Sequence, residues 1–472
     1  MDTAAAIAAA HARLADSRAE LETLARIASI SASPEHVDAV RASALATAEL
    51  LERVGLESVR LLELEGAHPS VLGEWCHAGP DAPTLLLYAH HDVQPPGVVA
   101  NWTADPFEPN ERNGRLYARG ICDDKAGIVT HTAAIAAWFD AHGTLPCNVK
   151  VFVEGEEEIG SPNLERFLTT YLDELGADVF VLADAGQWKL GEPAITTMLR
   201  GLLTVDVTLR ALDGPVHSGM FGGVVPDPTI ALARLITSMV DDHGDIAIAD
   251  FTDDVRALGS AERARIEGLG NDAASQLRAA GARPGVTPAG DPAVNVYERL
   301  WARPNLTVIA LDSHPLAGSS NQIVAAATAR LSFRLAPGQD PQRVAATVLD
   351  HITRHVPHGL ETTTHVHEAV PAWTCEPDGP AFAACERALE AGFGVSPRLM
   401  GIGGSVPFVG PFVAAFGGIP ALLVGPEDPH SHAHGEDESL HLDDWRKLIE
   451  SEIHLLAELG ALGRVGLGLP PA

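Results

Sequence analysis

The sequence is poor in basic residues and in cysteine. Lysine and arginine total 32 against 63 aspartates and glutamates, which gives a formal net charge of −31. Such a surface would repel a phosphate backbone, so we expect no nucleic acid partner. The five cysteines are scattered, odd in number and contain no CxxC pair. They therefore indicate neither a disulfide framework nor a thiolate zinc site.

Long apolar runs are also missing. The segment 1–30 is rich in alanine but is interrupted by His11, Arg13, Asp16 and Arg18, so it predicts an amphipathic helix rather than a signal peptide or a membrane span. No early strand is followed by a GxGxxG turn, which argues against a nucleotide-binding fold. We therefore expect a cytoplasmic protein that has no membrane partner.

The chain is long enough for two domains. Its 472 residues exceed one ordinary core, and a content of 46% hydrophobic and 20% charged residues is typical of folded proteins. In the first half, short apolar runs alternate with amphipathic ones, which predicts an α/β sheet flanked by helices. We assign this catalytic domain to 1–200 and 372–472, with 201–371 inserted between its two parts.

The inserted segment has a different pattern. Apolar and polar residues alternate over 202–212 and 328–337, as in half-buried antiparallel strands. Each run precedes a helical apolar stripe that opens with an Asp-Pro pair, at Asp227 and at Asp340. The segment 266–290 is rich in glycine and alanine and predicts an irregular excursion. The insert therefore predicts a small α+β domain.

Histidines and acidic residues follow four predicted strands. In open α/β sheets, ligands bind beyond the carboxyl ends of the strands, so these side chains can converge. Imidazole nitrogens and carboxylate oxygens are suitable ligands for one or two divalent metal ions. The candidates are His90, Asp123, Glu158 or a neighbour, Asp184 and a histidine of PHSHAHGE. A solvated acidic loop is the simpler interpretation of 156–158, and composition does not rank His430, His432, His434 and His441.

The motifs and their order resemble a known family. The resemblance is to the dinuclear zinc metallopeptidases of the aminoacylase, glutamate carboxypeptidase and carnosinase type, and most of all to the cytosolic nonspecific dipeptidases. It extends from about residue 88 to about residue 440 and rests on AHHDVQP, ARGICDDKAG, EGEEEIGS, LADAG, GPVHSGMFGG, GIGGSVPF and PHSHAHGEDES. One such motif is weak, whereas the ordered set is strong.

The resemblance implies two divalent metal ions per subunit, zinc or alternatively manganese. His90 and Asp184 would hold one ion, Glu158 and His434 the other, and Asp123 would bridge the two. Asp123 would also precede a cis peptide bond.

The resemblance also implies roles for residues around the metal ions. Asp92 would orient the ring of His90, and Glu157 would act as the general base. The insert would be a lid that forms a homodimer. Its His217 would enter the partner's active site and stabilise the oxyanion.

Four further residues would bind the substrate. Arg334 resembles the lid arginine that pairs with a C-terminal carboxylate, since a guanidinium binds carboxylates in a bidentate manner. Gly404 and Ser405 would lie near the same carboxylate, and Asn321 is a weaker contact candidate. Arg334 at a strand edge and His217 in a glycine-rich turn also have purely structural interpretations.

We expect a metal-dependent hydrolase that cleaves dipeptides or similar small peptides, with water attacking the scissile carbonyl and Glu157 as the base. An N-acyl or N-carbamoyl amino acid amidohydrolase is the alternative on the same fold. A catalytically silent scaffold is disfavoured, because the base and every aligned ligand are present.

Overall fold

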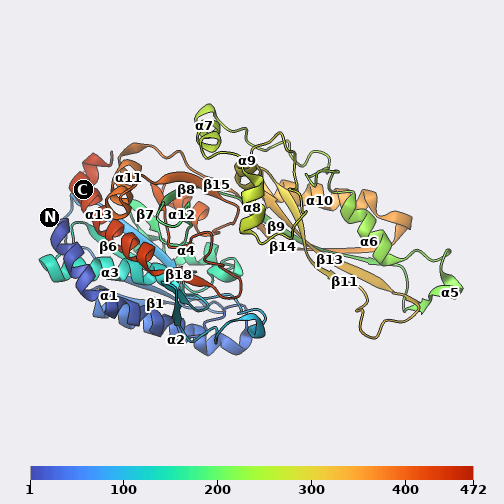
Figure 1. Cartoon of the computed structure of the whole chain (residues 1–472), viewed down its shortest axis with the longest axis horizontal. Coiled ribbons are helices and arrows are strands. Elements are labelled where there is room, and N and C mark those ends of the chain that lie inside the picture. Colours follow the sequence, from blue (N-terminus) through green and yellow to red (C-terminus); the bar gives the residue numbers. More distant parts are fainter. Residues whose placement is uncertain (1, 471–472) are drawn as a thin grey trace. The chain divides into compact units, whose positions relative to one another are not determined.

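The computed structural model describes residues 2–470 and divides the chain into two compact units (Figure 1). Unit 1 comprises Met1–Thr197, Cys375–Met400 and Val406–Ala472, and unit 2 comprises Met198–Thr374 and Gly401–Ser405. The short segment Gly401–Ser405 lies within a part of the chain that the sequence analysis assigned to the catalytic domain. Within residues 2–470, every helix is too short or too polar to span a lipid bilayer.

Unit 1 is an α/β structure that contains most of a mixed sheet of nine strands. Its helices are α1 (Thr3–Ala25), α2 (Val37–Arg53), α3 (Lys125–His142), α4 (Leu164–Leu175), α11 (Gly379–Phe393), α12 (Val409–Ala415) and α13 (Leu442–Gly466). The sheet strands are β1 (Glu57–Leu62), β2 (Ser70–Trp75), β3 (Thr84–His90), β6 (Asn148–Glu154), β7 (Val179–Leu182), β8 (Ala194–Leu199), β15 (Trp373–Thr374), β16 (Arg398–Ile402) and β17 (Ala421–Leu423). A small separate sheet contains β4 (Asn110–Arg112), β5 (Arg115–Tyr117) and β18 (Ser439–His441).

The central strands of this sheet are parallel. The order is β1-β2-β6-β3-β7-β17-β8-β15, with β16 beside β8. β3 runs parallel to β6 and β7, and β17 runs parallel to β7. The carboxyl ends of these four strands therefore lie at the same edge of the sheet, where the residues that follow them can meet.

Alternating side chains of the sheet face two different layers. Leu87, Val151 and Val181 belong to the large aliphatic core that includes residues of α1, α3, α11 and α13. The neighbouring Tyr88 and Phe152 instead contact Phe408 beside α12, with ring centroids 4.7 and 5.4 Å apart. The sheet is covered on both faces, which explains why its strands read as continuous apolar runs.

Unit 2 is an α+β structure. A four-stranded antiparallel sheet has the order β11-β13-β9-β14, and a two-stranded ribbon pairs β10 with β12. These strands are β9 (Gly201–Arg210), β10 (Val216–His217), β11 (Asn305–Asp312), β12 (Gln322–Ile323), β13 (Ala326–Leu335) and β14 (Glu361–Val370). The helices are α5 (Ser218–Phe221), α6 (Pro228–Thr237), α7 (Ser260–Gly268), α8 (Ala273–Ala279), α9 (Val296–Ala302) and α10 (Pro341–His355).

The Asp-Pro pairs begin the two helices that pack on this sheet. Asp227 accepts hydrogen bonds from the backbone N–H of Thr229 and Ile230, and Asp340 accepts one from that of Gln342. The irregular excursion predicted for 266–290 was wrong in part, because α8 and the end of α7 fall within it. The predicted fold class is confirmed: a mixed sheet between helices and an inserted α+β domain.

Candidate metal centre and substrate site

The predicted metal ligands of unit 1 come together beyond the strand ends. Nε2 of His90 lies 3.0 Å from Oδ1 of Asp123 and 3.8 Å from Oδ2 of Asp184. Nε2 of His434 lies 3.0 Å from the other oxygen of Asp123 and 3.1 Å from Oε2 of Glu158. Asp123 thus stands between two histidine-carboxylate sets, as a bridging ligand would. The peptide bond from Asp123 to Asp124 is cis.

The donor set suits divalent cations. Among residues 2–470, three groups bring at least three ligand atoms within 4.8 Å of one another: His90, Glu157 and Asp184; His90, Asp123 and Glu158; and Asp123, Asp184 and Glu427. Two of them combine an imidazole with carboxylates, the third consists of carboxylates alone, and each of His90, Asp123 and Asp184 belongs to two of the groups. An overlapping arrangement of this kind can hold two metal ions close together.

Buried negative charge is the main electrostatic property of the cluster. Burial raises the pKa of Glu157 well above its usual range; His90 opposes the shift, and the carboxylates of Asp184 and Glu158 reinforce it. Burial likewise raises the pKa of Asp184. Carboxylates in such an environment ionise only when positive charge is supplied. Two divalent cations would supply that charge.

The two histidines neutralise part of this charge. Hydrogen bonds to Asp123 and Glu158 raise the pKa of His434 to about 11. Burial opposes ionisation of Asp123, but the hydrogen bonds from His434 and His90 outweigh it and hold its pKa below the ordinary value. The two imidazole rings therefore lie beside Asp123, at the positions where cations are expected.

Asp92 and Gln94 fix the side chains around the cluster. Backbone O of Asp92 lies 3.1 Å from Nδ1 of His90, and its Oδ2 accepts hydrogen bonds from Ser31 Oγ and the backbone N–H of Glu158. Nε2 of Gln94 donates to both the backbone O and Oε2 of Glu158, each at 2.9 Å. The backbone N–H of Gln94 donates to Oε1 of Glu158 at 3.0 Å. His90 thus contacts Asp92, and Glu158 is held by contacts with both Asp92 and Gln94.

A buried ion pair connects two of the ligand-bearing loops. Nη1 of Arg119 donates to Oε2 of Glu438 at 2.7 Å, and both side chains are almost completely buried. Glu438 also accepts hydrogen bonds from the backbone N–H groups of Gly120, Cys122 and Asp123. Nη2 of Arg119 donates to the backbone O of Gly435, next to His434. The pair therefore fixes Asp123 relative to His434.

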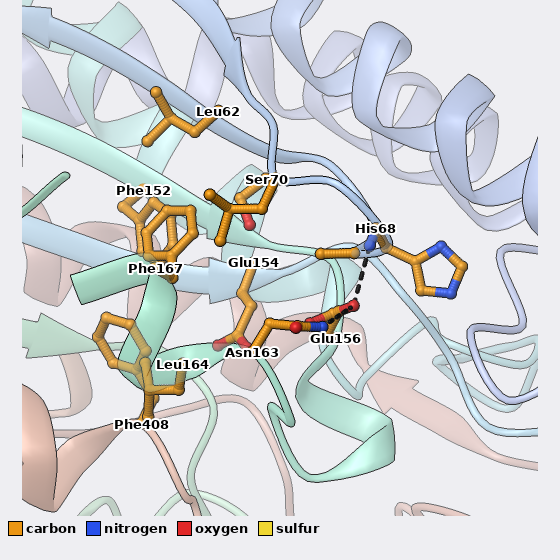
Figure 2. A pocket seen from close by; sticks show the side chains of 12 residues that line it. Leu62, His68, Ser70, Phe152, Glu154, Glu156, Asn163, Leu164, Phe167 and Phe408 are labelled. Atoms are coloured by element: carbon orange, nitrogen blue, oxygen red, sulfur yellow. Dashed lines mark hydrogen bonds between the residues drawn. The ribbon is translucent and has the colours of Figure 1, made fainter. Parts of the chain in front are cut away.

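The first glutamate after Gly155 points away from the cluster. Glu156 accepts hydrogen bonds from the backbone N–H of His68 at 2.9 Å and from Nδ2 of Asn163, as Figure 2 shows. It lines a small cavity with Phe152, Phe167 and Phe408. Glu154, on the same cavity, accepts a hydrogen bond from the hydroxyl of Tyr88 at 2.7 Å. Of the neighbouring glutamates, only Glu157 and Glu158 belong to the three ligand groups.

Several residues of the centre were not predicted from the sequence. Glu427 follows the end of β17 as Asp184 follows the end of β7, so the rule of strand ends could have identified it. Ser31, Gln94, Arg119 and Glu438 act through contacts with residues far away in the sequence. No sequence motif indicated that these four residues support the metal ligands.

The remaining predicted residues lie in unit 2. Nη1 of Arg334 donates to Oγ of Ser405 at 3.2 Å, and Gly404 precedes that serine. His217 is exposed, and its Nδ1 accepts a hydrogen bond from the backbone N–H of Gly219 at 3.0 Å. Asn321 lies next to His217 rather than to Arg334, because its backbone O accepts from Ser218 N. Arg334 with Ser405 and His217 with Asn321 thus form two separate pairs.

A family comparison agrees with this geometry. The sequence matches peptidase family M20/M25/M40 over residues 86–458. The chain belongs to this family. It is therefore a hydrolase that acts on peptide bonds, and the resemblance seen in the motifs is confirmed.

Three relatives illustrate the similarity. The cysteinylglycine-S-conjugate dipeptidase of Corynebacterium striatum is 32% identical over 93% of this chain and 95% of its own. The structure of the dipeptidase Dug1p from Saccharomyces cerevisiae matches with a TM-score of 0.87 at 21% identity, over 98% of this chain and 99% of that one. The structure of the metallo-carboxypeptidase Sso-CP2 from Sulfolobus solfataricus matches with a TM-score of 0.85 at 30% identity, over 94% of this chain and 99% of that one.

Proposed function

We propose that the protein is a metal-dependent dipeptidase. The observation that carries this proposal is the buried cluster around Asp123, in a peptidase chain whose 32% identical relative is a dipeptidase. The metallo-carboxypeptidase at 30% identity also acts at the carboxyl end of its substrate, as its name states. A dipeptide has a free C-terminal carboxylate, so a dipeptide substrate is compatible with both names.

His90 and Asp184 would hold one metal ion, Glu158 and His434 the other, and Asp123 both. Zinc is the proposed metal, and manganese is the alternative for this oxygen-rich set. When bound, such ions polarise a carbonyl group and lower the pKa of water. The imidazolium form of His434 gives up its proton when it becomes a ligand, because only neutral imidazole binds metals.

Glu157 is the proposed general base. Its carboxylate accepts a proton from the attacking water and then donates it to the leaving amine nitrogen, which balances the hydrolysis. The side chain is partly buried and belongs to the group with His90 and Asp184. Cations in that group would favour its ionised form, which is the form that accepts a proton.

His217 is the proposed oxyanion donor. Because its Nδ1 accepts the hydrogen bond from Gly219, the neutral ring carries its proton on Nε2. Nε2–H is thereby available as a donor for a developing oxyanion.

The partner that receives this histidine would be a second copy of the chain. Edge strand β11 exposes Val308, Ile309 and Leu311, and the segment after β10 exposes Met220 and Val224. An unpaired strand edge with apolar side chains is suited to pairing with another chain. We therefore propose a homodimer formed through unit 2, in which unit 2 also acts as a lid. Cys122, Cys147 and Cys385 are buried free thiols, which supports a cytoplasmic location.

The test is hydrolysis of a substrate panel by chelator-treated protein before and after zinc or manganese is added. The panel contains free dipeptides, N-acetyl amino acids and N-carbamoyl amino acids. Restored cleavage of free dipeptides would support the proposal. Cleavage of only the acylated compounds would instead assign the amidohydrolase alternative, and metal-independent cleavage would contradict the role of the cluster.

A further inference from the structure

Arg200 is a buried arginine near the half-buried Arg334. It follows β8, and only 9% of its surface is exposed. Its guanidinium donates to neutral acceptors: Nε to the backbone O of Gly403 at 3.1 Å, and Nη1 to Oδ1 of Asn305 at 2.6 Å. A buried cation ordinarily has an acidic partner. In the described part of the chain, neither Arg200 nor Arg334 forms an ion pair.

The two arginines affect each other. Burial, and after it the positive charge of Arg334, lowers the pKa of Arg200 to about 10. Burial also lowers the pKa of Arg334, while the negative charge of Glu368 opposes this effect. Two cations that repel each other, neither of them in an ion pair, favour the binding of an anion beside them.

The loop between the arginines is shaped by Arg200. A Cβ on Gly403 would lie 2.8 Å from Nη2 of Arg200, so only glycine fits there without a displacement of the guanidinium. A Cβ on Gly404 would meet only Cγ2 of Ile402, at 3.6 Å. Space for a small ligand group therefore exists at Gly404, next to the residue that Arg200 requires to be glycine.

Arg200 also fixes the backbone and the serine of this loop. Its backbone N–H donates to the O of Gly404 at 3.1 Å, and its backbone O accepts the hydroxyl proton of Ser405 at 2.6 Å. Oγ of Ser405 in turn accepts from Arg334. The Ser405 hydroxyl proton is thus used within the protein, and Ser405 positions Arg334 instead of donating to a ligand.

We propose that Arg200, a residue without an assigned role, joins Arg334 in an anion site at Gly404 that makes a free carboxylate of the substrate a requirement. Arg334 is the contacting residue. Arg200 supplies the second positive charge and positions the Gly403–Ser405 loop. The inference rests on the proposed function for its choice of substrate, but both dipeptides and N-acyl amino acids have such a carboxylate.

The experiment compares Ala-Ala with its C-terminal amide as substrates of the metal-loaded enzyme. For Arg200→Met, we expect the KM for Ala-Ala to rise roughly 10- to 100-fold, the usual range for the loss of a charge-assisted contact, with a smaller change in kcat. The poor activity on the amide should change little. Arg200→Lys keeps the charge but loses the hydrogen bonds of the loop, so we expect an intermediate KM.

Arg210→Met is the matched control, because it removes one positive charge from an exposed position of unit 2. It should leave the KM for Ala-Ala unchanged. An unchanged KM in folded Arg200→Met, or an equal rise for the amide, would overturn the inference. If Arg200→Met does not fold, the KM values of Arg200→Lys for Ala-Ala and for the amide provide the same test.

A binding measurement separates this inference from the proposed function. Calorimetry on metal-stripped protein would compare N-acetylalanine with N-acetylalanine amide. We expect the wild type to prefer the carboxylate and Arg200→Met to lose that preference. Such a result would stand even if no dipeptide were cleaved, whereas equal preference in both proteins would refute the role of Arg200.

Discussion

Replacement of Gln94 by leucine should weaken metal binding without unfolding the protein. Gln94 is half-buried, and its Nε2 donates to the backbone O and to Oε2 of Glu158. Leucine has a similar volume but no donor. The backbone N–H of residue 94 would still donate to Oε1 of Glu158, so this ligand would lose only part of its support.

The expected size of the effect follows from these contacts. A neutral hydrogen bond contributes about 1 kcal/mol and one to a carboxylate about 1.5–3 kcal/mol, and adjacent bonds are not additive. A net loss of about 2 kcal/mol corresponds to roughly 30-fold weaker binding. This agrees with the roughly 10- to 100-fold loss of metal affinity that is typical when a residue supporting a metal ligand is replaced.

The assay is competition between a chromophoric chelator and stripped protein for zinc. Asn101→Leu is the control, because its Nδ2 also donates to a carboxylate, that of the exposed Glu436. It should bind zinc as the wild type does. An affinity of Gln94→Leu within about threefold of the wild type would refute the argument that Gln94 holds Glu158 in place for metal binding.

Three further predictions concern single side chains. Glu157→Gln should lower kcat by about 10²- to 10⁴-fold and leave zinc binding intact; loss of zinc instead would make Glu157 a ligand. His217→Ala should lower kcat by about 10²- to 10³-fold with little change in KM, and unchanged turnover would exclude the oxyanion role. Burial raises the pKa of Glu154 to about 7 from 4.5, so the folded state binds this proton more tightly and stability should fall as the pH rises between these values. Glu154→Gln should reduce that fall in urea unfolding of the metal-stripped protein, and an identical pH profile would contradict the assignment.

Much of the centre could be predicted because it depends on strand ends. His90, Glu158 and Asp184 each follow a parallel strand, and parallel strands bring their carboxyl ends to one edge. The residues at the end of each predicted strand therefore sufficed to predict that these side chains lie close together. The choice of His434 among neighbouring histidines came from the family resemblance, and the structure places it beside Asp123.

The features that could not be predicted depend on contacts across the sequence. The four hydrogen bonds of Glu438 join it to Arg119 and to the loop that ends at Asp123, more than 300 positions away. Arg200 and Gly403 are 203 positions apart, and GIGGS alone shows only that the loop has little side-chain volume. The helix α8 within 266–290 was hidden by the surrounding glycines.

The most direct test of the account is a titration of metal-stripped protein with zinc, in which bound zinc per chain and Ala-Ala hydrolysis are measured on the same samples. We expect two zinc ions per chain, with activity recovered as the cluster around Asp123 fills. Asp123→Asn should weaken both sites together, because its carboxylate stands between both histidines. Full hydrolysis without bound metal, or undiminished zinc binding by Asp123→Asn, would contradict the central claim.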